Sequence, residues 1–86
     1  AALISVVGAD EPGRRVRELI AEFPAIQSEL ADDPGRTTST KIRCVAGSQQ
    51  MLRLDRETVA ALSTTAESSI VAKLTAALRP HSVVVL

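Results

Sequence analysis

The segment TTSTKIRCVAGSQQMLRLD, residues 37–55, decides the fold because apolar and charged side chains alternate on both sides of its single glycine. The apolar positions are Ile42, Cys44, Leu52 and Leu54, and the charged positions are Lys41, Arg43, Arg53 and Asp55. Successive side chains of a β-strand point to opposite faces of a sheet. The segment therefore predicts a two-stranded hairpin with one apolar face and one charged face.

The register of this hairpin follows from the need for both strands to share their faces, which favours a loop with an odd number of residues, Gly47-Ser48-Gln49. The expected pairs are Cys44 with Leu52, Ile42 with Leu54, Lys41 with Asp55, and Arg43 with Arg53. Two arginines directly opposite each other repel by up to about 1 kcal/mol. A bound phosphate or carboxylate would remove that penalty. Alternatively, both guanidinium groups extend into solvent and the pair has no ligand.

Size and composition restrict the classes of function. The chain has 86 residues, which allows one small domain, and its ten basic and ten acidic residues give a net charge of zero. This balance argues against a general binder of nucleic acid or anionic membranes. The single Cys44 excludes an internal disulfide and is expected to be a small core residue. No apolar run is long enough to span a membrane and no signal peptide is visible, so a cytoplasmic location is expected.

Both ends of the chain are apolar. It begins on the run Ala1–Val7 and ends on Val83–Leu86, and only 1% of its residues are aromatic. Continuous runs of Val, Ile and Leu are typical of strands buried on both faces of a parallel sheet. A native chain seldom ends within such a strand. We therefore expect residues 1–86 to be an internal fragment of one larger domain.

Three segments are expected along the chain. Residues 1–36 predict a β-α-β unit with strands at Ala1–Val7 and Ala25–Leu30; its helix is capped by Asp10 or Glu11 and ends at Phe23-Pro24. Residues 37–57 form the hairpin. Residues 58–86 predict a helix with capping-box spacing at Thr64–Glu67 and a final strand at Ser82–Leu86. This order favours a parallel sheet layered with helices, from which the hairpin protrudes.

Other candidate sites are weak. The loop Gly8–Gly13 lies between a strand and a helix but matches neither the dinucleotide nor the P-loop fingerprint. His81 has no metal-ligand partner at useful spacing, so it is expected in a surface loop, and no metal site is predicted. Long amides such as Gln49 and Gln50 at a hairpin tip can bond to sugar hydroxyls.

Two stretches resemble the ribokinase/PfkB-type carbohydrate kinases. VVGADEPGRRVRELI, Val6–Ile20, is similar to that family's Gly-x-Asp-x-x-Gly-x-x-Leu strand–helix element. DPGRTTSTKIRCVAGSQQMLRLDRE, Asp33–Glu57, resembles the turn and hairpin of its heptose-7-phosphate kinases. The chain departs from the family at Ser48, where Asn commonly precedes Gln-Gln, and at Ala9, where Asp is frequent. The implied fold class is α/β: a partial ribokinase-like parallel sheet with flanking helices and a protruding β-hairpin lid.

The resemblance also implies a function. Such kinases move the γ-phosphate of ATP to the anomeric hydroxyl of heptose 7-phosphate, and their hairpin covers the sugar and meets a second subunit. The implied substrate-binding residues are Lys41, Arg43, Gln49, Gln50, Arg53 and Asp55. The family's ATP and Mg²⁺ sites and its catalytic base lie in motifs outside this chain, so no catalytic residue is assigned and the segment alone is expected to be inactive. A non-catalytic α/β module that dimerises through the hairpin is the alternative.

Overall fold

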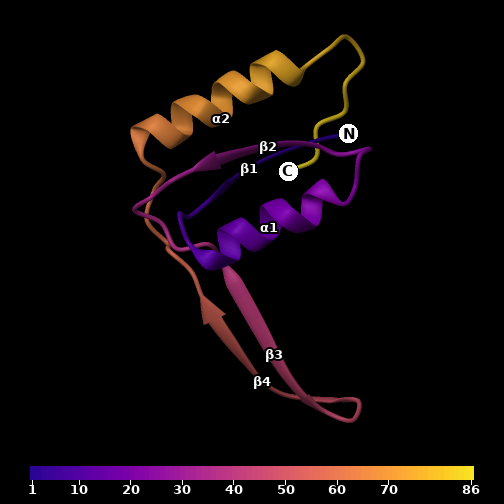
Figure 1. Cartoon of the computed structure of the whole chain (residues 1–86), viewed down its shortest axis with the longest axis vertical. Helices are drawn as coiled ribbons and strands as arrows, with labels where there is room; N and C mark the ends of the chain where they lie inside the picture. The colour runs from indigo at the N-terminus through magenta and orange to yellow at the C-terminus, as the bar shows by residue number, and fades with distance from the viewer.

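The computed structural model describes residues 1–86 as four strands and two helices (Figure 1). Their order is β1 Ala2–Val7, α1 Glu11–Ala21, β2 Gln27–Asp32, β3 Thr40–Ala46, β4 Gln49–Arg56 and α2 Thr64–Ala77. β1 and β2 form one sheet, and β3 and β4 form another. The molecule is therefore α/β, as expected, with the hairpin separate from the parallel sheet.

The parallel sheet is the β-α-β unit that the sequence predicts. β1 pairs with β2 from Ala2 opposite Gln27 to Val7 opposite Asp32. β2 begins two residues later than expected because a turn first uses Ile26, whose amide donates to the carbonyl of Phe23 at 2.9 Å. Helices α1 and α2 lie on opposite sides of the two strands (Figure 1). Both strands end where α1 begins, so their carboxyl ends share one edge of the molecule.

Both helices begin at side-chain caps. Asp10 caps α1 by accepting from the amide of Gly13, which confirms one of the two predicted caps. Ser63, not Thr64, caps α2, and its hydroxyl accepts from the amide of Ala66 at 3.2 Å. The expected capping box, Thr64 with Glu67, is therefore not formed: with Ser63 as the cap, the third helical residue is Ala66, which has no polar side chain to return a bond.

The hairpin has the predicted pairs but a different tip. Cys44 lies opposite Leu52 and Arg43 opposite Arg53, while a two-residue loop, Gly47-Ser48, replaces the expected three-residue loop. Gly47 has a φ of 61°, which the first central residue of a type II′ turn requires. An even loop alone would place the faces out of phase. The register shift between Cys44 and Val45 corrects the phase by leaving one β4 residue, Met51, as a bulge.

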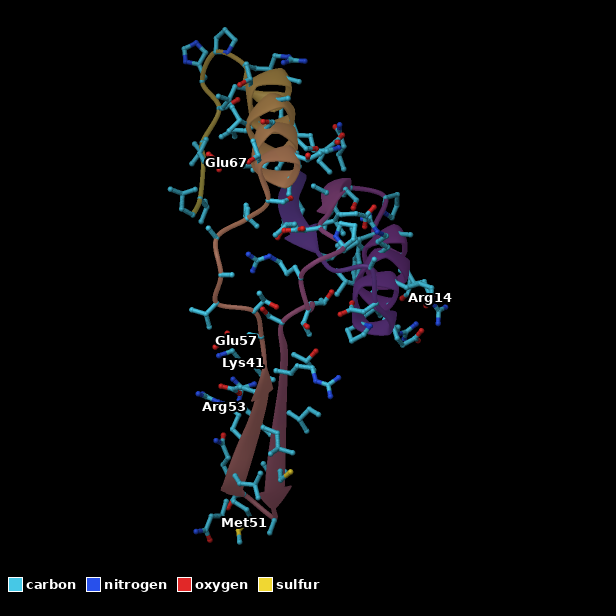
Figure 2. All side chains as sticks on the ribbon, turned by 90° about the vertical axis from the view of Figure 1, so that its left-hand side faces the viewer. Arg14, Lys41, Met51, Arg53, Glu57 and Glu67 are labelled. Atoms are coloured by element: carbon cyan, nitrogen blue, oxygen red, sulfur yellow. The ribbon has the colours of Figure 1, made fainter.

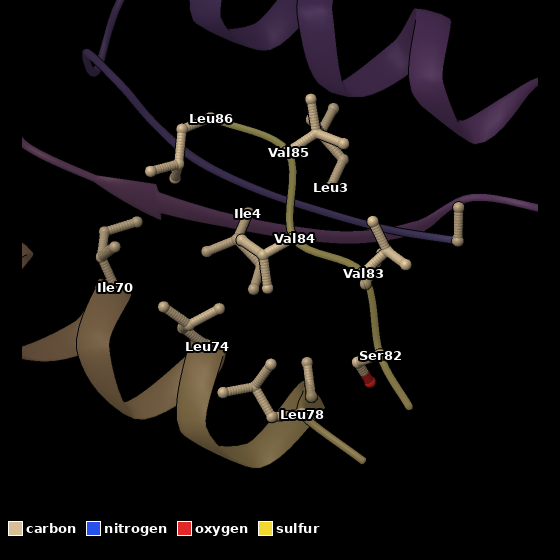
Figure 3. A pocket seen from close by; sticks show the side chains of 13 residues that line it. Leu3, Ile4, Ile70, Leu74, Leu78, Ser82, Val83, Val84, Val85 and Leu86 are labelled. Carbon is tan, nitrogen blue, oxygen red and sulfur yellow. The ribbon is translucent and has the colours of Figure 1, made fainter. Parts of the chain in front are cut away.

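The expected final strand is absent. Ser82–Leu86 carries no strand assignment; it follows a turn in which Ser82 donates its amide to the carbonyl of Arg79 at 3.0 Å. Figure 3 shows this segment crossing near β1 and α2, with Leu3, Ile4, Ile70 and Leu74 facing it across an apolar groove of about 430 Å³. Apolar composition alone therefore did not make a strand, because no backbone hydrogen bond joins the segment to the free edge of β1.

Little of the chain is buried. Its accessible surface is 6640 Å², whereas a compact monomer of 9.1 kDa exposes about 4900 Å². The excess of about 1700 Å² includes the apolar face of the hairpin, where Ile42 is 53% and Leu54 57% exposed. Cys44 is half-buried on the same face and is not the core residue that the sequence predicts.

The buried residues gather where the hairpin begins. Val7, Leu30 and Ala31 come from the ends of the parallel strands, and Asp33 and Thr38 are buried polar residues in the connection that follows. From this base the hairpin extends outward and gives the molecule a long dimension of 47 Å (Figure 1). No helix is long and apolar enough to cross a membrane.

Candidate functional site

The charged face of the hairpin carries Lys41, Arg43, Arg53 and Asp55, and we call these four residues the charged face. Figure 2 shows Lys41 and Arg53 on the same side of the hairpin ribbon. Asp55 lies between two cations: its carboxylate is 3.7 Å from Nζ of Lys41 and 3.0 Å from Nε of Arg53. These partly exposed ion pairs contribute little to stability. They orient the Arg53 side chain, because its bond to Asp55 uses Nε and leaves both terminal amino groups without a partner in the chain.

Arg43 has no carboxylate partner. It lies directly opposite Arg53 across the ladder, as the sequence predicts, and its guanidinium group makes no ion pair or side-chain hydrogen bond in the structure. With three cations and one anion, the charged face has a surplus of two positive charges although the whole chain is neutral. Arginine forks match the geometry of phosphate and carboxylate oxygens. This arrangement suits an anion placed between Arg43 and Arg53.

The structure separates the two glutamines of the tip. Gln50 pairs with Val45, and Gln49 pairs with Ala46. Because side chains alternate along β3, Val45 lies on the side of Arg43, and paired residues share a face. Gln50 therefore continues the charged face, whereas Gln49 lies on the apolar side of the tip. Of the six residues expected to bind substrate, five therefore lie on the charged side of the hairpin, and Gln49 lies on the apolar side.

A second polar cluster, which no local sequence pattern predicts, lies at the base of the hairpin. Thr38 and Asp10 meet there: the Thr38 hydroxyl donates to Oδ1 of Asp10 at 2.6 Å and its amide donates to Oδ2 at 2.9 Å. The same hydroxyl accepts from the amide of Gly8 at 2.8 Å, and Oδ1 also accepts from the amide of Gly13 at 2.9 Å. The Asp10 carboxylate therefore joins the first turn of α1 to the segment that leads into β3.

These hydrogen bonds favour the ionised form of Asp10. They lower the pKa of its carboxyl group below the ordinary value, with the hydroxyl of Thr38 as the largest cause and the amide of Thr38 next. Donors around a carboxylate favour its ionised form. Asp10 is therefore a fixed acceptor that ties two segments together.

The segment that follows β4 is held at the base of the hairpin by Arg36. Its Nη1 donates to the carbonyl of Thr58 at 2.9 Å, its Nη2 donates to the carbonyl of Ala60, and its Nε lies 3.6 Å from Oδ2 of Asp33. The hydroxyl of Thr58 accepts from the amide of Thr37 at 2.9 Å. The two chain segments that enter and leave the hairpin are thus held side by side at its base.

The residues of this chain do not fit an ATP or Mg²⁺ site. In the loop Gly8–Gly13, the amides of Gly8 and Gly13 already donate to side chains. The carbonyl of Arg36 also fills the space beside Gly8, where an added Cβ would lie only 2.1 Å from it. No group of three or more His, Cys, Asp or Glu residues could hold a metal ion. We therefore derive no chemical step through either group on this chain.

Comparison with curated proteins finds close relatives of this segment. A protein of Caulobacter vibrioides is 46% identical over 57 residues, which is 66% of this chain and 12% of the relative. Proteins of Campylobacter curvus and Gluconacetobacter diazotrophicus are 39% and 34% identical and cover 95% and 100% of this chain, which is 17% and 18% of their own lengths. All three are named bifunctional protein HldE. The chain thus spans less than a fifth of these relatives, and no family model matches it.

Proposed function

We propose that this chain, which is homologous to one segment of the bifunctional HldE proteins, supplies the substrate lid of a sugar kinase with a ribokinase-like fold. The proposed reaction transfers the γ-phosphate of ATP to the C1 hydroxyl of D-glycero-D-manno-heptose 7-phosphate, a step toward ADP-heptose and the lipopolysaccharide core. The printed name of the relatives and the resemblance of the hairpin motif support this assignment. Residues 1–36 and 58–86 would belong to the main sheet and its helices, and residues 37–57 would form the lid.

The observation that carries the proposal is the unneutralised arginine on the charged face. Arg43 has no acidic partner and faces Arg53, whose terminal amino groups are also free. The 7-phosphate of the sugar is a dianion at neutral pH and would bridge the two guanidinium groups. Such an ion relieves the repulsion between the arginines, so it binds a site that is already arranged for it.

The role of this chain is to bind and orient the sugar. ATP with Mg²⁺, held by other parts of the full-length protein, would supply the phosphoryl group. Phosphoryl transfer depends on positioning and on electrostatic stabilisation. Arg43 and Arg53 would hold the phosphate end of the heptose, and Gln50, on the same face, would bond to its hydroxyls. A closed hairpin would also exclude water that competes with the C1 hydroxyl.

The apolar face of the hairpin supports a second part of the proposal, a homodimer. Ile42, Leu52 and Leu54 are about half exposed, and they form a continuous patch with Cys44. A face of this kind is typical of an interaction surface. We infer that it packs against the equivalent face of a second subunit while the charged face points toward the substrate.

Arginine variants of the full-length protein test the binding role. Arg53→Ala and Arg43→Ala should each raise the Kd for heptose 7-phosphate by about tenfold or more, since a hydrogen bond to a charged group contributes roughly 1.5–3 kcal/mol. Their melting temperatures should stay close to the parent value, because both side chains are exposed. The measurement is isothermal titration calorimetry beside thermal unfolding.

Arg56→Ala is the matched control. Arg56 lies on β4 opposite Thr40, so alternation places it on the apolar side of the hairpin. It should bind the sugar phosphate with parental affinity. Equal losses of affinity in Arg53→Ala and Arg56→Ala, or a loss of binding that only follows a loss of folding, would refute the assignment.

The exposed apolar face also favours a second candidate, a non-catalytic module that dimerises through the hairpin. Ligand response separates the two functions. Heptose 7-phosphate should raise the melting temperature of the full-length kinase, in proportion to the logarithm of its concentration above Kd. An unchanged melting temperature at millimolar sugar phosphate would favour the module.

A further inference from the structure

The orientation of the hairpin depends on its base alone. No side-chain hydrogen bond or ion pair joins β3 or β4 to the helices or to the parallel sheet, and the two strands pack mainly against each other. Only Ser39 separates Thr38 from the first residue of β3, and only Glu57 separates the last residue of β4 from Thr58. The contacts at Thr38 and Thr58 therefore set the direction in which the hairpin points.

We propose that Asp10 and Thr38 are positioning residues that hold the hairpin in register with the carboxyl ends of β1 and β2. Thr38 connects three segments: its hydroxyl links Gly8, directly after β1, to Asp10 at the start of α1, and its backbone continues into β3. The carboxyl ends of parallel strands are the usual place for a ligand in open α/β sheets. The assigned role rests on the proposed lid function, but the geometry that it predicts can be measured without activity.

A small rotation at the base of the hairpin would produce a large displacement of its tip. β3 has seven residues, so at about 3.3 Å per residue the tip lies roughly 23 Å from Thr40. A rotation of about 10° at the base would move the tip by about 4 Å and Arg43, about 10 Å from Thr40, by about 2 Å. Misplacement of a binding group by about 1 Å can cost a factor of about a hundred in rate. A loosened base would therefore impair substrate positioning without changing any residue of the charged face.

Two sets of contacts hold the two strands of the hairpin at its base, one for each strand. Thr38 and Asp10 fix the strand that enters the hairpin to the parallel sheet, and Arg36 fixes the strand that leaves it to the segment 36–37. One tie alone would allow the hairpin to pivot. Because Thr37 and Thr38 are adjacent, the two ties meet at neighbouring residues.

Three variants isolate the positioning role. Thr38→Val keeps the shape of the side chain and removes the hydroxyl that bonds both Gly8 and Asp10. Asp10→Asn retains a good helix cap but turns an amide donor toward the amide of Thr38, which leaves two donors opposed. Thr38→Ser keeps the hydroxyl and is the rescue variant. Thr37→Val is the matched control, because the Thr37 hydroxyl makes no hydrogen bond in the structure.

The first measurement is the position of the hairpin itself. Spin labels at Ser48→Cys and Arg15→Cys, in full-length protein with Cys44→Ser and its other cysteines replaced, report the distance from the hairpin tip to α1 by double electron–electron resonance. Thr38→Val and Asp10→Asn should broaden this distance distribution by several ångströms, while Thr38→Ser and Thr37→Val should leave it narrow. An unchanged distribution in both Thr38→Val and Asp10→Asn would overturn the proposal, whatever the enzyme does.

The second measurement links the position to the reaction. In steady-state assays Thr38→Val should raise KM for heptose 7-phosphate about tenfold and leave KM for ATP within about twofold, because the loosened element would contact only the sugar. A broadened distance with both KM values unchanged would support the positioning role and refute the proposed lid function. Equal increases in both KM values, with a narrow distance distribution, would refute the positioning role.

Discussion

Replacing Gly8 with alanine should destabilise the protein through a backbone clash at the base of the hairpin. An added Cβ would lie 2.1 Å from the carbonyl oxygen of Arg36 and 3.0 Å from the amide nitrogen of Thr38. Both atoms belong to the backbone, so no side-chain rotation relieves the contact. The turn that carries Arg36 would have to move away from β1.

The expected cost can be worked from two terms. Overpacking of a closely packed site costs about 1–3 kcal/mol. Movement of the turn also weakens the bond from the Gly8 amide to the Thr38 hydroxyl, which is 2.8 Å long and buried, at about 1 kcal/mol. Gly8→Ala should therefore lower the free energy of unfolding by about 2–4 kcal/mol, measured by urea unfolding of the full-length protein followed by circular dichroism.

Two other glycines serve as controls, because neither has a neighbouring atom that an added Cβ would meet and they differ in backbone conformation. Gly35 has no atom within 4 Å of an added Cβ and has an ordinary φ, so Gly35→Ala should be neutral or gain about 0.4–1 kcal/mol. Gly47 is equally open but has a φ of 61°, so Gly47→Ala should cost about 1–2 kcal/mol of backbone strain. The order of destabilisation is then Gly8, Gly47, Gly35. A Gly8→Ala cost no greater than that of Gly47→Ala would refute close packing at the base.

Two further predictions concern acid and association. Hydrogen bonds donated by Thr38 lower the pKa of Asp10 in the folded protein. The stabilisation that Asp10 contributes is therefore present above its ordinary pKa and is lost as the pH falls below about 4. Asp10→Asn should flatten the fall of the unfolding free energy in acid, and an unaltered fall would contradict the contact between Asp10 and Thr38. Leu54→Glu places a charge on the apolar face and should convert the proposed dimer to monomer, measured by analytical ultracentrifugation. Arg43→Glu, on the opposite face, should leave the dimer intact, and a dimer that persists in Leu54→Glu would place the interface elsewhere.

Local alternation predicted the faces and pairs of the hairpin, because these depend only on a period of two within one short segment. Parity places Arg43 and Arg53 on the same face, and the position of the turn at Gly47 places them opposite each other. The tip was not predictable in the same way, because an odd loop and an even loop with one bulge satisfy the same parity. The separation of Gln49 from Gln50 across the two faces is a consequence of that choice, and it changes which amide can reach the substrate.

Contacts between distant segments were not predictable from local patterns. Asp10 and Thr38 are separated by 28 residues, and the helix-capping rule accounts for only one oxygen of Asp10. A signal was present: a capping carboxylate with a second oxygen needs another donor when it is buried, and a run of threonines follows the next turn. The expected strand Ser82–Leu86 did not form either, because apolar composition does not specify the backbone hydrogen bonds that pair a segment with a sheet edge.

The bulge at Met51 has a consequence for how the length of this hairpin can vary between related proteins. An insertion or deletion at a regular ladder position reverses every side chain beyond it and would place leucines where the arginines stand. Removal of Met51 would instead leave Gln50 opposite Val45 and Leu52 opposite Cys44, so both faces would keep their residues. Relatives can therefore gain or lose one residue at this position without exchanging the two sides of the ribbon, and we expect length differences near the tip to concentrate there.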